Sequence, residues 1–445
     1  MQRREFLQNT LVTVAGVSIP GRMFAAADAA PASSAPAATV PASPAAAAPT
    51  AMELATARLY QLGRRNVPMH DPSAIQKCKD EYWIYRSQNQ SFRSKDLLNW
   101  TNGPAVLSVP FPWFANAVPG FRGTAFWAPD VLKFGDQYHL FYAISAFGKN
   151  TSAIGHATNP TLDPADSNYQ WADQGMVIKS VATDDFNCID PAAVLDAEGN
   201  LWLAFGSFWT GIKLIALDRK TGQRIPGSPM TAIAANPLHA TATTEGRRED
   251  SINKSQIEAP YLYYQNKFYY LFVNWGLCCH GVASTYNIRI GRSEKITGPY
   301  LDKDGKDLAH DGGTLFFGDE GPLVPTTPGR PGAVPPQAHA LVGPGQSGIF
   351  QEGDKFWFSC HYYDATANGA SDLSIRPLTW DKSGWPALGE YSESAPKPTR
   401  PPQGAGRGRG RRGGGNAPTS TGAPSPIAPA SSGSISKSVG SIAPN

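Results

Sequence analysis

The sequence has no apolar run long enough to cross a bilayer. A spanning helix needs about 20 predominantly apolar residues, and the best candidate, residues 11–19, is much shorter. The chain also lacks a strong charge of either sign, because 39 Lys and Arg against 36 Asp and Glu leave a formal net charge of +3. These absences argue against an integral membrane protein and against nucleic-acid binding, which requires a basic surface.

Cysteine is scarce as well. The 445 residues contain five, at irregular spacing: Cys78, Cys188, Cys278, Cys279 and Cys360. An odd number without paired spacings fits neither a zinc site nor a disulfide framework. Two interpretations of the adjacent Cys278 and Cys279 stay open, a strained vicinal disulfide and two buried thiols.

The two ends of the chain lack the composition of a folded core. Residues 1–27 combine Arg3 and Arg4 with a short apolar stretch and small residues near position 26, which predicts a twin-arginine export signal rather than a short buried helix. Residues 28–54 are an Ala/Pro-rich linker, and residues 393–445 are a disordered tail rich in Pro, Gly, Arg and Ser. The expected location is therefore periplasmic or extracellular.

The tail contains the basic run GRGRGRRGGG at residues 406–415. Such a run is found in RNA-binding segments, but in an exported protein a solvated tail is the simpler interpretation. Residues 55–392 remain, and this globular part is rich in Trp, Tyr and Phe and long enough for a sizeable core.

Five segments within residues 55–392 share one pattern. Each has a distinctive first residue, an apolar run, a polar turn and a second run rich in aromatic residues; the first residues are Asp71, Ala128, Asp190, Glu258 and Gln346. Turns such as GD, EGN and QNK between strand-like runs are typical of β-hairpins. The sequence therefore contains five hairpin repeats, spaced 57 to 88 residues apart.

Five such repeats without helical periodicity predict an all-β fold, specifically a five-bladed β-propeller. A β-sandwich would also contain many short strands. It would not, however, place the same hairpin after the same kind of residue five times.

Propeller geometry brings equivalent positions of the repeats to one central channel, so Asp71, Asp190 and Glu258 should converge. A buried carboxylate is costly unless it is paired or used. The alternative is that each acid caps a local turn. Two carboxyl groups flanking a glycosidic bond can cleave it, and a third can raise the pKa of the proton donor. The three acids therefore favour a glycoside hydrolase.

Aromatic rings stack on the apolar faces of sugars, and several lie near the repeats. The candidates are Trp113, Phe114, Trp127, Phe147, Phe208, Trp209 and Trp275. Most aromatic residues of a propeller pack between blades. Trp127 and Trp209 are the best candidates, since each lies near the start of a hairpin or in the loop after it.

Six motifs occur in an order that resembles the glycoside hydrolase family 43 arabinanases. They are MHDPS at 69–73, FWAPDV at 126–131, NCIDPA at 187–192, FGSFWTGIKL at 205–214, IEAPYLYY at 257–264 and STYNIRIGRS at 284–293. The resemblance covers residues 65–390. It implies an inverting, monomeric hydrolase of α-1,5-linked L-arabinofuranose chains, acting on arabinan or arabino-oligosaccharides.

The resemblance also implies roles for individual residues. Asp71 would be the general base, Glu258 the general acid, and Asp190 the residue that raises the pKa of Glu258 and orients it. Sugar contacts would come from Asn187, Ser207, Phe208 and Trp209, and His70 would position the base or contact a sugar.

The chain departs from the family in the fifth repeat, where GPGQS at 343–347 stands in place of the usual GPGHN. The family His ligates a calcium ion in the central channel, and here Gln346 takes its place. A glutamine carbonyl is an acceptable ligand for Ca²⁺, and His339 is a second candidate to reach inward. The chemistry itself requires no cofactor.

Two other functions stay open. One is an arabinofuranosidase or β-xylosidase of the same family, although FGSFWTGIKL and STYNIRIGRS favour an arabinanase. The other is a sugar-binding propeller that has lost catalysis, against which the three acids argue. Endo or exo cleavage depends on loops such as the insertions at about 221–250 and 302–340.

Overall fold

The computed structural model describes residues 48–123, 125–236, 256–310, 312–322 and 339–392. The expected export signal, most of the linker, the basic tail and parts of both insertions lie outside these ranges. Helix α1 (Ala51–Gln61) spans residue 54, at which the sequence analysis ended the linker. Among the described residues, no helix is long and apolar enough to cross a membrane.

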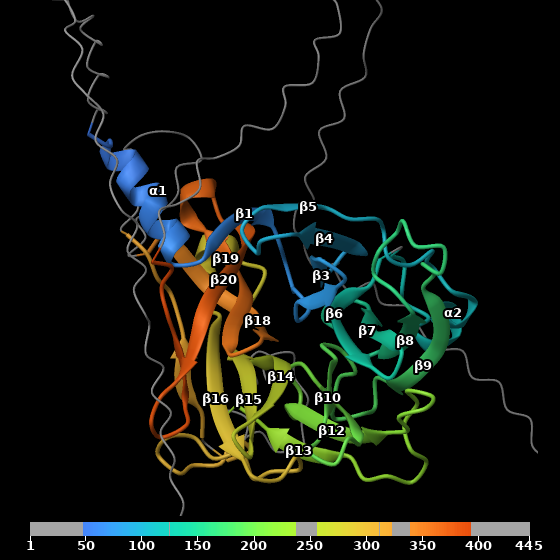
Figure 1. Ribbon diagram of the computed structural model, residues 1–445. Coiled ribbons are helices and arrows are strands. Elements are labelled where there is room, and N and C mark those ends of the chain that lie inside the picture. The colour runs from blue at the N-terminus through green and yellow to red at the C-terminus, as the bar shows by residue number, and fades with distance from the viewer. Residues whose placement is uncertain (1–47, 124, 237–255, 311, 323–338, 393–445) are drawn as a thin grey trace, which may run out of the picture. The chain divides into compact units, whose positions relative to one another are not determined.

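Five small antiparallel sheets surround a common centre (Figure 1). The first three blades follow one another along the chain, each with its strands in sequence order. The first blade consists of β2 (Gln76–Cys78), β3 (Glu81–Arg86), β4 (Gln90–Ser94) and β5 (Trp100–Asn102). The second consists of β6 (Trp127–Phe134), β7 (Gln137–Ser145), β8 (Ser152–Asn159) and β9 (Ala172–Ser180). The third consists of β10 (Ala192–Leu195), β11 (Leu201–Phe205), β12 (Ile212–Leu217) and β13 (Thr231–Ala234).

The last two blades complete the ring, and the fifth contains the three longest described strands, β18, β19 and β20. The strands of these two blades are β14 (Ile257–Gln265), β15 (Phe268–Trp275), β16 (Asn287–Ser293) and β17 (Thr314–Phe317) in the fourth; and β18 (Leu341–Glu352), β19 (Lys355–Asp364), β20 (Ala370–Trp380), β21 (Pro386–Leu388) and β1 (Arg64–Pro68) in the fifth. Short helices α2 (Pro112–Ala117), η2 (Gly281–Ala283) and η3 (Ala365–Ala367) lie in connections. The predicted five-bladed β-propeller is confirmed.

The five predicted hairpins are the first two strands of the five blades. Their closing pairs are Cys78 with Glu81, Phe134 with Gln137, Leu195 with Leu201, Gln265 with Phe268, and Glu352 with Lys355. Turn chemistry between aromatic and β-branched runs was therefore a sufficient signal for these hairpins.

The alignment of the fourth repeat was wrong by one residue. A non-glycine residue with φ between 41° and 59° begins each hairpin, namely Asp71, Ala128, Asp190, Ala259 and Gln346. The fourth is Ala259, not Glu258. Glu258 instead pairs with Asn274 before a bulge, as Trp127 pairs with Ala143. Glu258 therefore lies one residue before the position that Asp190 occupies in its own repeat.

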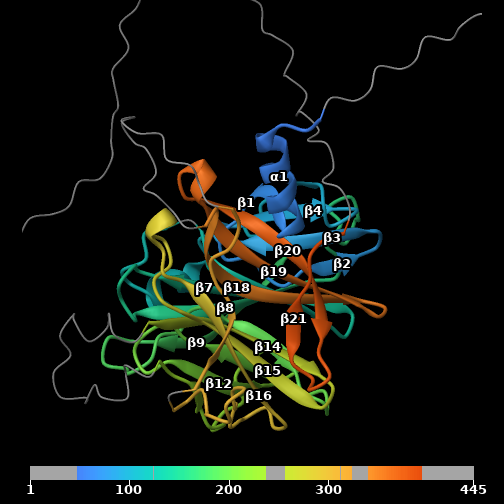
Figure 2. The same ribbon diagram turned by 90° about the vertical axis from the view of Figure 1, so that its left-hand side faces the viewer.

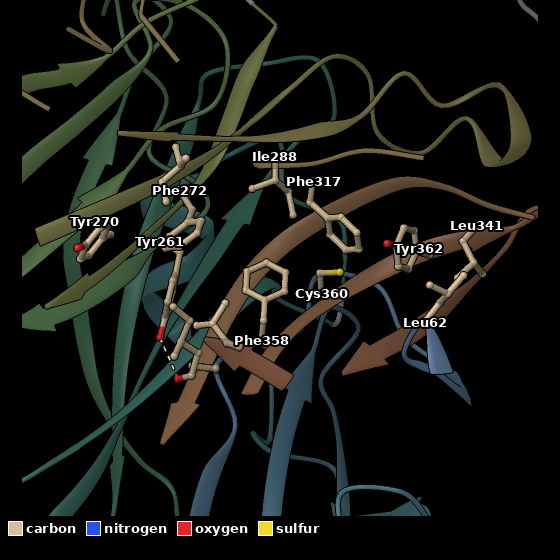
Figure 3. Packing of buried hydrophobic residues seen from close by; sticks show 14 of the residues in the cluster. Leu62, Tyr261, Tyr270, Phe272, Ile288, Phe317, Leu341, Phe358, Cys360 and Tyr362 are labelled. Atoms are coloured by element: carbon tan, nitrogen blue, oxygen red, sulfur yellow. Dashed lines mark hydrogen bonds between the residues drawn. The ribbon is translucent and has the colours of Figure 1, made fainter. Parts of the chain in front are cut away.

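Five apolar clusters form the core, one for each interface between neighbouring blades. Figure 3 shows the cluster between the fourth and fifth blades, where Phe272 and Ile288 face Phe358 and Cys360. The Tyr261 hydroxyl also donates a hydrogen bond to the Ile349 carbonyl across this interface, at 3.2 Å. Each blade is therefore buried on both faces by its neighbours.

The ring is closed by β1, which comes from the start of the chain and pairs with β20 of the last blade (Figure 2). Buried Arg65 fixes this junction. Its guanidinium donates to the carbonyls of Ile375 at 2.6 Å and Leu97 at 3.2 Å and lies 4.4 Å from the ring centre of Tyr391. The Val67 N–H donates to an Asp372 carboxylate oxygen at 2.6 Å.

We predict that Arg65→Ala lowers the free energy of unfolding by about 3 kcal/mol, because it removes the buried hydrogen bonds to the Ile375 and Leu97 carbonyls and the contact with the Tyr391 ring. Urea unfolding followed by tryptophan fluorescence measures the change. Lys95→Ala is the control: Lys95 is 71% exposed in its ion pair, so a change of only about 0.5 kcal/mol is expected. Equal stability of the two variants would contradict this role for Arg65.

Candidate active site

A cavity of about 810 Å³ is lined by residues from all five blades. The sequence singled out fifteen residues as catalytic, sugar-contacting or metal-ligating. Eleven of them lie on the cavity wall: His70, Asp71, Trp127, Phe147, Asn187, Asp190, Ser207, Phe208, Trp209, Glu258 and Gln346. They come from the segments that enter the first strands and from the loops that follow the second strands. Ring closure therefore brings together residues that are up to 276 positions apart, as His70 and Gln346 are.

Asp71 is held as a carboxylate by His70. One carboxylate oxygen lies 2.9 Å from His70 Nδ1, and the other accepts a hydrogen bond from the Ser87 hydroxyl at 2.6 Å. Burial alone would raise the pKa of Asp71, but the charge and hydrogen bond of His70 outweigh it and lower that pKa. Asp71 is therefore ionised throughout the neutral pH range.

His70 carries the matching positive charge. Burial opposes its protonation, but the neighbouring Asp71 carboxylate raises the pKa of His70 to about 11. Its Nε2 lies 2.9 Å from the Tyr363 hydroxyl. These contacts on both nitrogens fix the ring and hold the Asp71 carboxylate in one orientation.

His361 contacts both His70 and Asp71. The Asp71 N–H donates to His361 Nδ1 at 3.2 Å, and the His361 ring stacks on His70 at 4.5 Å between centroids. Burial lowers the pKa of His361 to about 3, so this imidazole is neutral. Its Nε2 is buried and has no hydrogen-bond partner among the described residues.

Glu258 lies in a different environment. It is 7% exposed, and its two carboxyl oxygens accept hydrogen bonds from Ser207 Oγ and the Tyr286 hydroxyl, each at 2.6 Å. Burial raises the pKa of Glu258, and the negative charge of Asp71 adds to this effect, while the two hydroxyl donors oppose it. The net shift is upward, which favours the protonated acid.

Asp190 is the third buried acid. One of its oxygens accepts a hydrogen bond from the Ala259 N–H at 3.1 Å, directly beside Glu258. Burial raises the pKa of Asp190 well above its ordinary value, and the charges of Glu258 and Asp71 add to this effect. Two acids that interact this closely titrate as a pair. The pair of Asp190 and Glu258 therefore still holds a proton at a pH at which Asp71 is already ionised.

Aromatic side chains provide a second element of the cavity wall. Phe147 is 85% exposed, which is unusual for a phenylalanine, and it shares the wall with Trp127, Phe208 and Trp209. Phe208 and Trp209 both have positive φ, at 56° and 43°, so the loop after β11 is held in a strained turn at the cavity.

Three aromatic candidates from the sequence do not line the cavity. Trp113 and Phe114 pack against each other, with ring centroids 4.5 Å apart, in the core between the first two blades. Trp275 packs in the core between the third and fourth blades beneath Arg289. Their proposed sugar contacts are therefore wrong, because the neighbouring blade already covers these rings.

Several important residues were missed by the sequence analysis. Ser87, Tyr286 and His361 bind the catalytic candidates directly, yet none was singled out. Ser87 and His361 follow or lie in the second strand of a repeat, opposite His70 and Gly345. Aligning the second strands as well as the first would have drawn attention to these two positions.

The structure shows the cysteine pair in the reduced state, as two thiols. Cys278 is half-buried, Cys279 is exposed, and their sulfurs lie 2.8 Å apart without a bond. Both line the cavity. The prediction of two buried thiols is therefore wrong for Cys279.

The expected metal ligand Gln346 lies on the cavity wall, and its N–H donates to Asn274 Oδ1 at 3.1 Å. His339 does not line the cavity. The donor atoms of His70, Asp71 and His361 also lie within 4.8 Å of one another. Protonated His70 cannot ligate a cation, so this group does not fit a metal ion.

Comparisons with known proteins identify the family of the chain. The model of glycosyl hydrolases family 43 matches residues 66–386. The extracellular endo-α-(1→5)-L-arabinanase 1 of Bacillus subtilis is 38% identical over 330 residues, covering 73% of this chain and 89% of that protein. The extracellular exo-α-(1→5)-L-arabinofuranosidase of Cellvibrio japonicus is 35% identical, covering 74% and 88%.

Solved structures show the same fold. The α-L-arabinanase of Cellvibrio cellulosa in complex with arabinohexaose has a TM-score of 0.64 at 34% identity, covering 72% of this chain and 95% of that chain. The exo-1,5-α-L-arabinanase from a bovine ruminal metagenomic library has a TM-score of 0.62 at 36% identity, covering 74% and 99%.

We predict that Tyr286→Phe raises the pKa of Glu258 by about one unit, because the lost hydroxyl stabilises the ionised carboxylate. A ¹³C NMR titration of glutamate carboxyl groups measures the shift. Tyr82→Phe is the matched control, since the Tyr82 hydroxyl donates to the distant, exposed Glu352 at 2.9 Å. An unchanged or lowered pKa of Glu258 in Tyr286→Phe would refute the assignment.

Proposed function

Because the chain belongs to glycosyl hydrolases family 43 and is a glycoside hydrolase, we propose that it cleaves α-1,5-linked L-arabinofuranosyl bonds of arabinan with inversion. One observation carries the proposal: a single cavity holds an ionised Asp71 and a proton-retaining pair, Asp190 and Glu258. Hydrolysis of a glycosidic bond with inversion needs one base and one acid in these two states. The relatives named for arabinan-degrading activities indicate the sugar.

Asp71 acts as the general base. Its carboxylate takes a proton from a water molecule as the water attacks the anomeric carbon. The hydrogen bonds from His70 and Ser87 occupy one position on each oxygen, which leaves the remaining lone pairs for water. His70 makes Asp71 a weak base but keeps it ionised and correctly oriented.

Glu258 acts as the general acid. It gives its proton to the oxygen of the leaving sugar, and its two hydroxyl partners, Ser207 and Tyr286, stabilise the carboxylate that forms. Asp190 lies beside it, and mutual repulsion keeps one proton on the pair before the reaction. The same contacts thus support Glu258 in both of its protonation states.

The aromatic residues bind the arabinan chain. Exposed Phe147 presents a ring that no described neighbour covers fully, and Trp127, Phe208 and Trp209 extend the apolar surface. Such rings bind the apolar faces of sugars, while polar groups including Asn187 orient the hydroxyls.

An exo-acting arabinofuranosidase is the second candidate. This candidate is supported by one relative at 35% identity and one solved structure at 36% identity, both of which are named as exo-acting enzymes. The endo-acting relative has a similar identity of 38%. Identity alone therefore does not separate the two modes of cleavage.

We also propose that the family's channel ion would be held by the Gln346 side-chain carbonyl and His361 Nε2. The buried, unpartnered Nε2 of neutral His361 fits a cation ligand. The ion would supply positive charge at the channel. Calcium should raise the melting temperature of the wild type but not of Gln346→Ala; an equal response of both would exclude Gln346.

Export is proposed from residues 1–27, which lie outside the described ranges, and from the two relatives named as extracellular. Replacing Arg3 and Arg4 with Lys should retain the protein in the cytoplasm. Normal export of that variant would refute a twin-arginine signal.

We predict that Asp71→Asn and Glu258→Gln each lower kcat on debranched arabinan by about 10²- to 10⁴-fold while leaving the circular dichroism spectrum unchanged. The amides keep the shape but can neither accept nor donate the required proton. Asp163→Asn on the surface is the matched control and should keep full activity. Near-normal turnover in either site variant would refute its role.

We predict that ¹H NMR shows the β-anomer of arabinofuranose as the first product, because attack from the face opposite the leaving group inverts the α-bond. Chromatography of the same samples identifies the mode of cleavage: mixed oligosaccharides indicate endo cleavage, and one short product indicates exo cleavage. An α-anomer first product would contradict inversion. Activity on β-xylosides alone, or binding without products, would contradict the substrate or the enzymatic function.

A further inference from the structure

One reactive group on the cavity wall has no part in the proposed mechanism. Cys278 and Cys279 lie between β15 and η2, with their sulfurs 2.8 Å apart. The other three cysteines, Cys78, Cys188 and Cys360, are buried. The pair is therefore the thiol group of the described chain that solvent and substrate can reach.

The geometry of the pair suits a bond that forms and breaks readily. A disulfide has a bond length of about 2.05 Å, so a small rotation of the exposed Cys279 side chain brings the sulfurs together. The α-carbons of adjacent residues are about 3.8 Å apart, closer than the 4.4 to 6.8 Å usual for disulfides. A vicinal bond is consequently strained, and strained, accessible disulfides are the easily reduced ones.

The surroundings of Cys279 activate its sulfur. Cys279 Sγ lies 3.7 Å from Nε2 of the charged His70, and its N–H donates to the Tyr363 hydroxyl at 2.7 Å. The hydrogen bond from Cys278, together with His70, lowers the pKa of Cys279 to about 5, whereas the same hydrogen bond and burial raise the pKa of Cys278. Cys279 is thus the thiolate nucleophile, and Cys278 holds the proton.

We propose that Cys278 and Cys279 form a thiol–disulfide exchange site on the wall of the catalytic cavity, and that its oxidation state controls hydrolysis. The site takes a small-molecule disulfide such as oxidised glutathione as its oxidant and a thiol as its reductant. The effect on hydrolysis rests on the proposed function; the exchange chemistry does not.

The exchange proceeds in two balanced steps. The Cys279 thiolate attacks one sulfur of the oxidant, forming a mixed disulfide and releasing one glutathione thiolate. Cys278 then loses its proton to solvent or to that thiolate, attacks Cys279 Sγ and releases the second glutathione. The two cysteines are oxidised to one disulfide, and one glutathione disulfide is reduced to two thiols.

Closing the disulfide removes a negative charge from the site. The titratable groups around Cys279 come from five segments: His70 and Asp71 before β2, Tyr363 on β19, Asp190 before β10, Glu258 at the start of β14, and Cys278 in its own loop. The Cys279 thiolate raises the pKa of both Glu258 and Asp190. Oxidation therefore lowers the pKa of the general acid, so less of it is protonated at neutral pH.

The bond itself is tested on the full chain in glutathione buffers of varied reduction potential. Thiol titration without denaturant should find two reactive thiols in the reduced protein and none after oxidation, and mass spectrometry should find the loss of two hydrogen atoms within the peptide of Cys278 and Cys279. Cys278→Ser should instead trap a glutathione adduct on Cys279. Two reactive thiols that persist in the most oxidising buffer would overturn the proposal.

The link to hydrolysis is tested by the pH dependence of kcat on debranched arabinan. The basic limb, which reports deprotonation of the acid, should move to lower pH by about half a unit on oxidation. The variant with both Cys278→Ser and Cys279→Ser should give one profile in both buffers. An oxidised wild type with an unchanged profile would overturn the control of hydrolysis. No hydrolysis in either state would instead count against the proposed function, while the thiol titration still decides the exchange site.

Discussion

The site depends on repulsion among three carboxyl groups, of which Asp71 has a cationic partner and Asp190 and Glu258 are buried. Asp71, Asp190 and Glu258 line the same cavity, and His70 is the protonated neighbour of Asp71. Protonated His70 stabilises the negative charge of Asp71. Burial and repulsion disfavour further negative charge on Asp190 and Glu258, so this pair keeps a proton. A base and an acid thus arise from three chemically similar side chains through their different surroundings.

Closure of the propeller ring brings these carboxyl groups together in one cavity. Five apolar clusters hold the blades together, and β1 joins the first part of the chain to the last blade. This closure also places His361 of the fifth blade beneath Asp71, where its neutral Nδ1 accepts the Asp71 N–H. The pairing of β1 with β20 therefore both stabilises the fold and helps to position the proposed base, Asp71.

The sequence was sufficient for the fold and for eleven residues of the cavity wall, because turns and strand periodicity are local signals that recur five times. It failed where the outcome depended on register or on packing between blades. Glu258 was aligned one residue too early since its charge, rather than the Ala-Pro dipeptide, was taken as the marker. Trp113 and Trp275 were chosen for their chemistry, but neighbouring blades cover them. Ser87, His361 and Tyr286 act through contacts that only the closed ring creates.

A carboxyl-resolved ¹³C NMR titration of the wild type, assigned with single Asp and Glu variants, tests the central claim most directly. The account predicts that Asp71 titrates below the ordinary range of an aspartate, near 3.9, and that a proton on the Asp190 and Glu258 pair titrates above the range of both residue types. Three carboxyl groups that titrate together near their ordinary values, or an Asp71 that titrates last, would contradict it.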